Sequence, residues 1–337
     1  MSRMPIGIDR RAPDDERLRS HTEAVVFERT RRRFLVERIL CPVDLSETSR
    51  TALRYAVALA KFYDAEIRAL HVVDVALGAG SAAPALDYIR ATRAEARVEL
   101  RHGVREFLEP AEAAGVQTKI DIQEGFTVEQ ILEYAAASRA GMIVMGTRGF
   151  SGIKRLVLGS TAEKVLRNAW CPVLTVPPHA QRTPPSHRPL FSNMLCPVNF
   201  SDSSLRALGL ALAVAQEVDG RLTLLHAIDQ IMADPVAGRI GRDAEVGCQF
   251  LELERDARDR LRRIIPDDAW AWCNPEETIV IADTPVRAIL RAAKDTGAEL
   301  VVMSLRRRGG IDRMLFGSTT QDVIRGATCP VLTLRAA

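Results

Sequence analysis

The feature that most constrains this chain of 337 residues is an internal repeat, because a duplicated sequence predicts a duplicated fold. Residues 39–46 read ILCPVDLS, and residues 194–201, 155 positions later, read MLCPVNFS. Residues 171–175 and 329–333 both read CPVLT, at an offset of 158 positions. The regular spacing indicates two tandem copies of one domain, with three extra residues in the second copy between about positions 227 and 278.

Each copy alternates short apolar runs with longer helical patterns. In the first copy the predicted strands are residues 38–43, 66–73, 117–123, 141–146 and 172–176. The predicted helices are residues 47–62, 88–114, 127–139 and 160–168. The apolar runs are rich in β-branched residues and lack a polar face, which is typical of buried parallel strands. The alternation therefore predicts an α/β fold, with a parallel sheet that helices cover on both faces.

Composition suggests where the domains begin and end. Residues 177–190 contain five prolines, so residues 178–191 are predicted to be a linker. The first domain is then predicted at residues 37–177 and the second at residues 192–335. Residues 1–36 are predicted to be a flexible N-terminal arm.

Charge and hydropathy exclude several kinds of partner. The net charge is +3, and residues 1–38 carry all of it, with ten arginines against seven acidic residues. The balanced remainder argues against a nucleic-acid partner, since binding a phosphate backbone requires a basic face. No apolar run approaches the ~18 residues that span a bilayer, and the N-terminus lacks the apolar segment of a signal peptide. We therefore expect a cytoplasmic protein without a membrane partner. The six cysteines lack the spacing of a zinc site.

The most informative segment follows the fourth predicted strand of the first copy. It comprises Met145-Gly146-Thr147-Arg148-Gly149, then nine residues, then Gly159-Ser160-Thr161. Gly146 and Gly149 are expected to adopt positive φ and to let a ligand approach the main chain. Ser160 and Thr161 place hydroxyl and N–H groups at a helix N-terminus, where anions are stabilised. The segment has no Walker lysine, but its spacing predicts a phosphate-binding loop.

The pattern Gly-x2-Gly-x9-Gly-Ser, together with Cys-Pro-Val-Asp-Leu-Ser after the first strand, resembles the ATP-binding universal stress proteins. The whole sequence resembles a tandem, two-domain member, over residues 37–177 and 192–335. The resemblance implies two tandem open parallel sheets of the nucleotide α-hydrolase-like (Rossmann-like) type. Each would have five strands in the order 3-2-1-4-5. In that order the ends of strands 1 and 4 flank the crevice where open α/β sheets bind ligands.

By this resemblance, ATP with Mg²⁺ is the expected cofactor. The adenine and ribose side would be lined by Pro42, Val43 and Asp44, and Val72 would meet the adenine through its backbone. The ribose and phosphates would be held by Met145, Gly146, Gly149, Gly159, Ser160 and Thr161. Asp44 would accept a hydrogen bond from a ribose hydroxyl or help to hold Mg²⁺. A structural alternative for Asp44 is the N-cap of the helix that starts near Ser46.

The second copy departs from this motif. Asn199 replaces Asp44, Ser304 replaces Gly146, and Arg307 replaces Gly149. If the two glycine positions require positive φ, each side chain costs on the order of 1–2 kcal/mol. The second copy is therefore predicted to be a structural partner that binds no ATP tightly. Recruitment of a different anion by residues 306–308, all arginine, remains an alternative.

Pairing of the two copies gives a physical reason to retain the degenerate one. Domains of the family that this chain resembles dimerise through their last strands, which here are residues 173–176 and 331–334. We expect these strands to form an intrachain pseudo-dimer that covers two exposed sheet edges. Whether whole chains also form a homodimer is left open.

Three functions fit the sequence. The first is an ATP-binding stress-response or signalling module that hydrolyses ATP slowly at most. The second is an enzyme of the wider nucleotide α-hydrolase-like group that transfers nucleotidyl groups or hydrolyses ATP. The third is an interaction scaffold that uses no nucleotide. The chain has no HxGH-type or SGGxDS-type motif, which disfavours the second, and the intact loop of the first copy disfavours the third.

Overall fold

The computed structural model describes residues 36–74, 86–148, 158–180, 190–229, 243–267, 269–273, 275–282, 284–305 and 318–335. Residues 1–35 of the predicted arm and most of the predicted linker lie outside these ranges, whereas Val36, predicted as the end of the arm, is buried in the core. The strands of the first half are β1 (Arg38–Pro42), β2 (Glu66–Asp74), β3 (Thr118–Gly125), β4 (Met142–Gly146) and β5 (Val173–Val176). Its helices are α2 (Glu47–Tyr63), α3 (Leu86–Ala113), α4 (Thr127–Ala137) and α5 (Ser160–Asn168). All nine elements predicted for the first copy are present, with ends shifted by at most two residues.

The second half repeats this order and adds one short helix. Its strands are β6 (Asn193–Pro197), β7 (Arg221–Asp229), β8 (Glu276–Ala282), β9 (Leu300–Leu305) and β10 (Val331–Arg335). Its helices are α6 (Asp202–Val218), α8 (Asp243–Ile264), α9 (Ala269–Trp272), α10 (Pro285–Asp295) and α11 (Ser318–Gly326). No helix in the described ranges combines the length and the apolar character that crossing a bilayer requires.

The ten strands form one continuous sheet in the order β3-β2-β1-β4-β5-β10-β9-β6-β7-β8. The expected order 3-2-1-4-5 is therefore confirmed within each half, but the expectation of two separate five-stranded sheets is wrong. Strand β10 pairs with β5 antiparallel, as expected for the pseudo-dimer, whereas every other pairing is parallel. The sheets merge because β5 and β10 would otherwise expose unpaired backbone groups along two edges.

The junction of β5 and β10, which we call the seam, is nearly symmetric. Leu332 lies opposite Leu174 at its centre. On either side a buried threonine hydroxyl donates to a carbonyl of the other strand, from Thr175 to Val331 (3.1 Å) and from Thr333 to Val173 (3.3 Å). These matched contacts join the halves as two copies of one surface.

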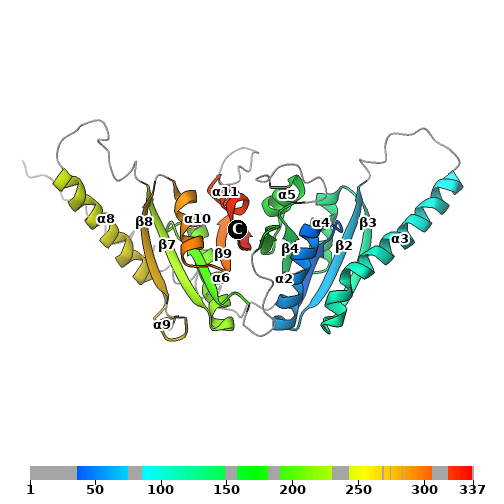
Figure 1. The fold of residues 1–337 in the computed structure, drawn as a ribbon, viewed down its shortest axis with the longest axis horizontal. Helices are drawn as coiled ribbons and strands as arrows, with labels where there is room; N and C mark the ends of the chain where they lie inside the picture. The colour runs from blue at the N-terminus through cyan, green and yellow to red at the C-terminus, as the bar shows by residue number, and fades with distance from the viewer. Residues whose placement is uncertain are drawn as a thin grey trace, which may run out of the picture.

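Helices cover the continuous sheet on both faces (Figure 1), and α3 and α8 lie at opposite ends of the molecule. One core cluster includes buried residues of α2, α3, α6, α8 and α9, and the other includes those of α4, α5, α10 and α11. Each cluster spans both halves, so the two repeats share their hydrophobic core across the seam.

Candidate functional site

The candidate site lies where the chain leaves β1 and β4. These two strands are neighbours, and Leu40 pairs with Ile143. Counted along this register, Val43 comes beside Gly146 at the carboxyl ends of the strands. Successive connections from β1 and β4 diverge to opposite sides here, because β1 leads to α2 on one face and β4 leads to α5 on the other. This is the switch point at which open parallel sheets form a crevice.

Asp44 organises the turn that follows β1. Its Oδ1 accepts hydrogen bonds from the backbone N of Ser46 (3.1 Å), from the Ser46 hydroxyl (2.6 Å) and from the Ser49 hydroxyl (2.5 Å). The Ser46 hydroxyl in turn accepts from the backbone N of Ser49 and is the N-cap of α2. The proposal that Asp44 itself is the N-cap is therefore wrong in detail, since Asp44 holds the capping residue in place.

The segment around β1 and β2 uses its backbone for internal bonds. The N–H of Val43 donates to the carbonyl of Leu70 (2.9 Å), and Nδ1 of His71 donates to the carbonyl of Val43 (2.8 Å). Pro42 ends β1 half-buried, and Val43 is buried. Val72 is half-buried against the core beneath α4 and α5. Of these residues, Pro42, His71 and Val72 retain partly exposed surface.

Gly146 is present for packing and not for backbone conformation. It does not adopt positive φ, so that prediction was wrong for this position, and Gly149 lies outside the described residues. A Cβ on Gly146 would lie 2.5 Å from Cγ2 of Thr48 in the first turn of α2. The glycine therefore lets α2 pack directly against the end of β4.

The N-terminus of α5 follows the end of β4 closely and has no side-chain cap. The N–H of Gly159 donates to the carbonyl of Thr147 (2.8 Å), which ties α5 directly to the end of β4. Gly159 is the N-cap, with φ −60° and ψ 141°, and no side chain caps the helix. The N–H groups of Ser160 and Thr161 in the first turn have no acceptor within the helix. Such a terminus is a ready anion-binding site.

Two residues of the motif, Met145 and Thr147, are buried. The Met145 side chain packs in the core beneath α4 and α5, and its expected contact with the ribose and phosphates stays a prediction. Thr147 was quoted only as part of the motif, yet it is buried and its backbone bonds to both Val176 and Gly159. Sequence spacing alone carries no signal for this role, because it comes from a main-chain bond between two ends of a loop.

The second half keeps the turn but changes its charge. Asn199 Oδ1 accepts from the backbone N of Ser201 (3.2 Å) and from the Ser201 hydroxyl (2.6 Å), in the positions matched to Asp44 and Ser46. Ser304 lies within β9, so the argument that positive φ penalises its side chain does not hold. The arginines at 306–308 and Gly317 lie outside the described residues.

The described residues contain no metal-binding cluster, and the thiols of Cys41 and Cys171 are not in their reactive form. Within the described ranges, no group of three or more His, Cys, Asp or Glu side chains is arranged to hold a metal ion. Burial raises the pKa of Cys41 to about 12 and that of Cys171 to about 11, which keeps both thiols protonated at neutral pH.

Comparison with known proteins agrees with the architecture. A family model described as the universal stress protein family matches residues 36–177 and again residues 190–335. A universal stress protein of Mycolicibacterium smegmatis is 28% identical over 306 residues, which cover 88% of this chain and 96% of that protein. One of Methanocaldococcus jannaschii is 37% identical over 142 residues, which cover 42% of this chain and 82% of that protein.

Among solved structures, a universal stress protein from Archaeoglobus fulgidus superposes with a TM-score of 0.62 at 25% identity, covering 90% of this chain and 99% of that chain. The two matches to the family model account for both halves of the continuous sheet. This chain therefore belongs to the universal stress protein family, as a member with two tandem domains.

Proposed function

We propose that the first half of this protein binds ATP with Mg²⁺ as a stress-response or signalling module, and that the second half binds no ATP tightly. The observation that carries the proposal is the uncapped N-terminus of α5, tied by Gly159 to the residue that follows β4. Of the four other helices with described N-caps, α2, α6 and α10 satisfy that terminus with a Ser or Thr hydroxyl, and α4 does not. A helix N-terminus without a side-chain cap suits a phosphate group.

The contrast between Asp44 and Asn199 supports a ligand role for the carboxylate. Both residues accept the same pair of hydrogen bonds from the serine two positions later. The turn therefore needs an oxygen acceptor at this position but no negative charge. We therefore assign the charge of Asp44 a contact with a ribose hydroxyl or with a magnesium ion.

The donor set suits Mg²⁺ only when the ion arrives with the nucleotide. Magnesium in nucleotide sites takes one or two carboxylates together with phosphate oxygens and water. Asp44 supplies a single carboxylate at the crevice, and a dedicated all-protein cage is absent from the described residues. When bound, the ion would neutralise phosphate charge, and Asp44 would help to hold it.

Hydrolysis is expected to be slow at most. Fast phosphoryl transfer to water needs a residue that orients the attacking molecule. The polar side chains of Asp44, Ser46 and Ser49 bond to one another at the mouth of the crevice. This arrangement holds a turn and does not aim a base at the phosphates.

The test measures nucleotide on the purified full-length chain. The protein is denatured and the supernatant assayed for adenine nucleotide, and the native protein is then titrated with ATP and Mg²⁺ while phosphate release is followed. Gly159→Arg should abolish uptake, because its side chain would occupy the approach to the α5 N–H groups. Gly317→Arg, at the matched position of the second half, should change uptake little. Absence of ATP binding to the wild type, or rapid turnover, would overturn the proposal.

A further inference from the structure

A phenylalanine occupies a position in α4 that normally carries a capping residue. Phe126 is the N-cap of this helix, has φ −75° and ψ 120°, and provides no cap hydrogen bond. Its side chain is 56% exposed, although it is large and apolar. The matched residue of the second half is Thr284, whose hydroxyl accepts from the backbone N of Arg287 (3.4 Å) and caps α10. The first half therefore forgoes a favourable cap and exposes an aromatic ring at the same place.

The backbone before Phe126 determines where the ring stands. Gly125 ends β3 with φ 151°, a conformation that side chains rarely adopt, and pairs with Asp74 at the end of β2. A Cβ on Gly125 would lie 3.0 Å from Cγ of Gln130, so the first turn of α4 packs closely over this glycine. Thr127 donates to the Asp74 carboxylate (3.0 Å) and so links the start of α4 to β2. Phe126 is thereby held at the carboxyl ends of β2 and β3.

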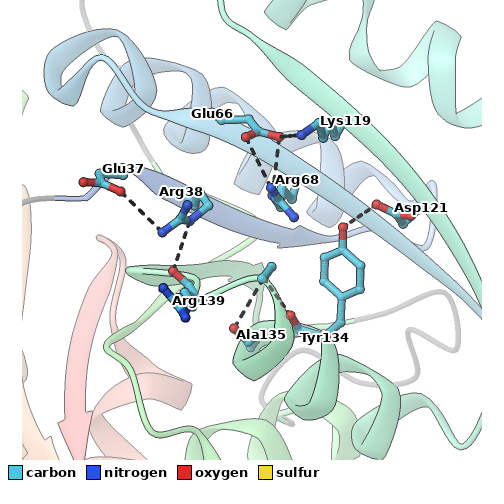
Figure 2. A network of polar contacts seen from close by, with 10 residues as sticks. Glu37, Arg38, Glu66, Arg68, Lys119, Asp121, Tyr134, Ala135 and Arg139 are labelled. Carbon is cyan, nitrogen blue, oxygen red and sulfur yellow. Dashed lines mark hydrogen bonds and ion pairs between the residues drawn. The ribbon is translucent and has the colours of Figure 1, made fainter.

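Polar contacts further down the helix anchor α4 against the sheet. Figure 2 shows Tyr134 of α4 pointing to Asp121 of β3, to which its hydroxyl donates a hydrogen bond. Nearby, Glu66 pairs with Arg68 (3.4 Å) and with Lys119 (3.3 Å), across β2 and β3. The Tyr134–Asp121 hydrogen bond therefore anchors α4 to β3, and the ion pair of Glu66 with Lys119 joins β2 to β3.

Phe126 and the α5 N-terminus lie on the same face of the sheet. Val72 and Val128 pack against the cluster that contains the buried residues of α5. Strands lie about 4.8 Å apart, so the end of β3 is about 10 Å from the end of β1, with the end of β2 between them. A nucleotide whose phosphates meet α5 and whose ribose lies near Asp44 would extend its base toward β2 and β3.

We infer that Phe126 is a further ligand contact, which stacks on the planar base of the nucleotide bound in the first half. The inference rests on the proposed function. An exposed aromatic ring offers a face on which a heteroaromatic base stacks favourably, and the ligand would cover the apolar surface that water now contacts. It assigns to Phe126 the base contact, and to α5 the phosphate contact.

The experiment exploits the matched residue of the second half. Phe126→Thr in the full chain restores the cap that Thr284 provides, so its melting temperature should rise by about 2 °C. Its affinity for MgATP should fall about 5- to 100-fold, the range expected for loss of one base–aromatic contact. Its affinity for inorganic triphosphate, which has no base, should stay within about twofold. Phe126→Tyr, which keeps the ring, should retain MgATP affinity.

The control is Thr284→Phe, which should lower the melting temperature and leave MgATP affinity unchanged. If Phe126→Thr binds MgATP as tightly as the wild type, or loses MgATP and triphosphate equally, the base contact is refuted while the proposed function stands. If the wild type binds neither ligand, the proposed function fails and the inference fails with it. A protein that becomes more stable yet binds nucleotide more weakly would be difficult to explain by a structural role of Phe126.

Discussion

The ends of β4 and β9 differ between the halves in a way that single positions do not reveal. In the first half Gly146 accommodates the methyl group of Thr48, since a Cβ would lie 2.5 Å from it. In the second half Ser304 has a Cβ, but Thr48 is replaced by Ser203, which lacks the methyl group. The pair therefore changes together and conserves the total volume between helix and strand.

A second pair of matched positions shows the same exchange. Leu45 and Phe200 both have positive φ, at 64° and 59°, directly after the turn that precedes α2 or α6. Leu45 faces Gly103 of α3, whereas Phe200 lies under Arg260 of α8, whose guanidinium carbon is 4.1 Å from the ring centroid. The comparison teaches that packing units diverge as groups, and a residue that looks like a lost ligand contact can be one side of a packing change.

The largest expected effect tests the first pair. Gly146→Ser should destabilise the protein by about 1–3 kcal/mol, because the new Cβ must displace Thr48 or shift α2. Thr48→Ser combined with Gly146→Ser should recover most of this loss, because it recreates the arrangement of the second half. Urea denaturation of the two single variants and the double variant measures the coupling. Strictly additive effects would show that the two positions do not act as one packing unit.

The same pair shows what sequence could and could not predict. The repeat, the strand order within each half and the strand pairing at the seam followed from local periodicity and the family resemblance. That this pairing joins the two halves into one sheet, in which the seam satisfies the backbone groups of two edges, was not predicted. The reason for Gly146 was predicted wrongly, because its neighbour Thr48 lies on another element and only packing brings them together. Phe126 escaped notice because exposure and an absent cap become visible only in three dimensions.

The next prediction concerns a hydrogen bond between the two halves that the matched residues do not reproduce. The hydroxyl of Tyr63 in α2 donates to Glu217 in α6 (2.7 Å), whereas the matched residues are Val218 and Phe62. Tyr63→Phe should cost about 1 kcal/mol, because the carboxylate loses a donor, while Phe62→Leu should leave this hydrogen bond intact. Thermal denaturation at neutral pH compares the two variants. An unchanged stability in Tyr63→Phe would mean that the hydrogen bond joins the halves without stabilising them.

The pH dependence of this contact has a defined direction. Burial, followed by the hydrogen bond and charge of Glu217, raises the pKa of Tyr63 above its ordinary value. The stabilisation is therefore complete below about pH 10, the ordinary pKa of tyrosine, and is lost as pH rises beyond it. Tyr63→Phe should reduce this loss of stability at alkaline pH. Denaturation between pH 8 and 11 should show that the variant loses about 1 kcal/mol less unfolding free energy than the wild type.

A further pair of effects, each similar in size to that of Tyr63→Phe, should be equal in the two halves. Thr175→Val and Thr333→Val each remove one hydroxyl that bonds across the seam. Each should cost about 1 kcal/mol, because both hydroxyls are buried and both donate to a carbonyl of the opposite strand. Matched denaturation curves would support a symmetric seam. A difference much larger than the error of the measurement would show that one half contributes more to the junction.

The smallest effect concerns His226 of the second half, which lies close to Phe200 and Arg260. Nδ1 of His226 donates to the carbonyl of Val198 (2.8 Å), and its ring lies 4.7 Å from that of Phe200. Burial lowers the pKa of His226, the charge of Arg260 lowers it further, and the bond to Val198 opposes both. Because protonation is disfavoured in the folded state, the contribution of His226 to stability is present above its ordinary pKa of about 6.5 and is lost as pH falls below it.

Arg260→Gly introduces the glycine that the first half has at the corresponding place, Gly103. It should raise the pKa of His226 and reduce the loss of stability at acid pH. An NMR titration of the histidine ring measures the shift directly. Arg255→Gly, at an exposed position of the same helix, should impose a similar cost on the helix and leave the titration unchanged. If both variants titrate as the wild type does, the arginine over Phe200 acts through packing alone, and the second half has gained a stacked aromatic contact without an electrostatic one.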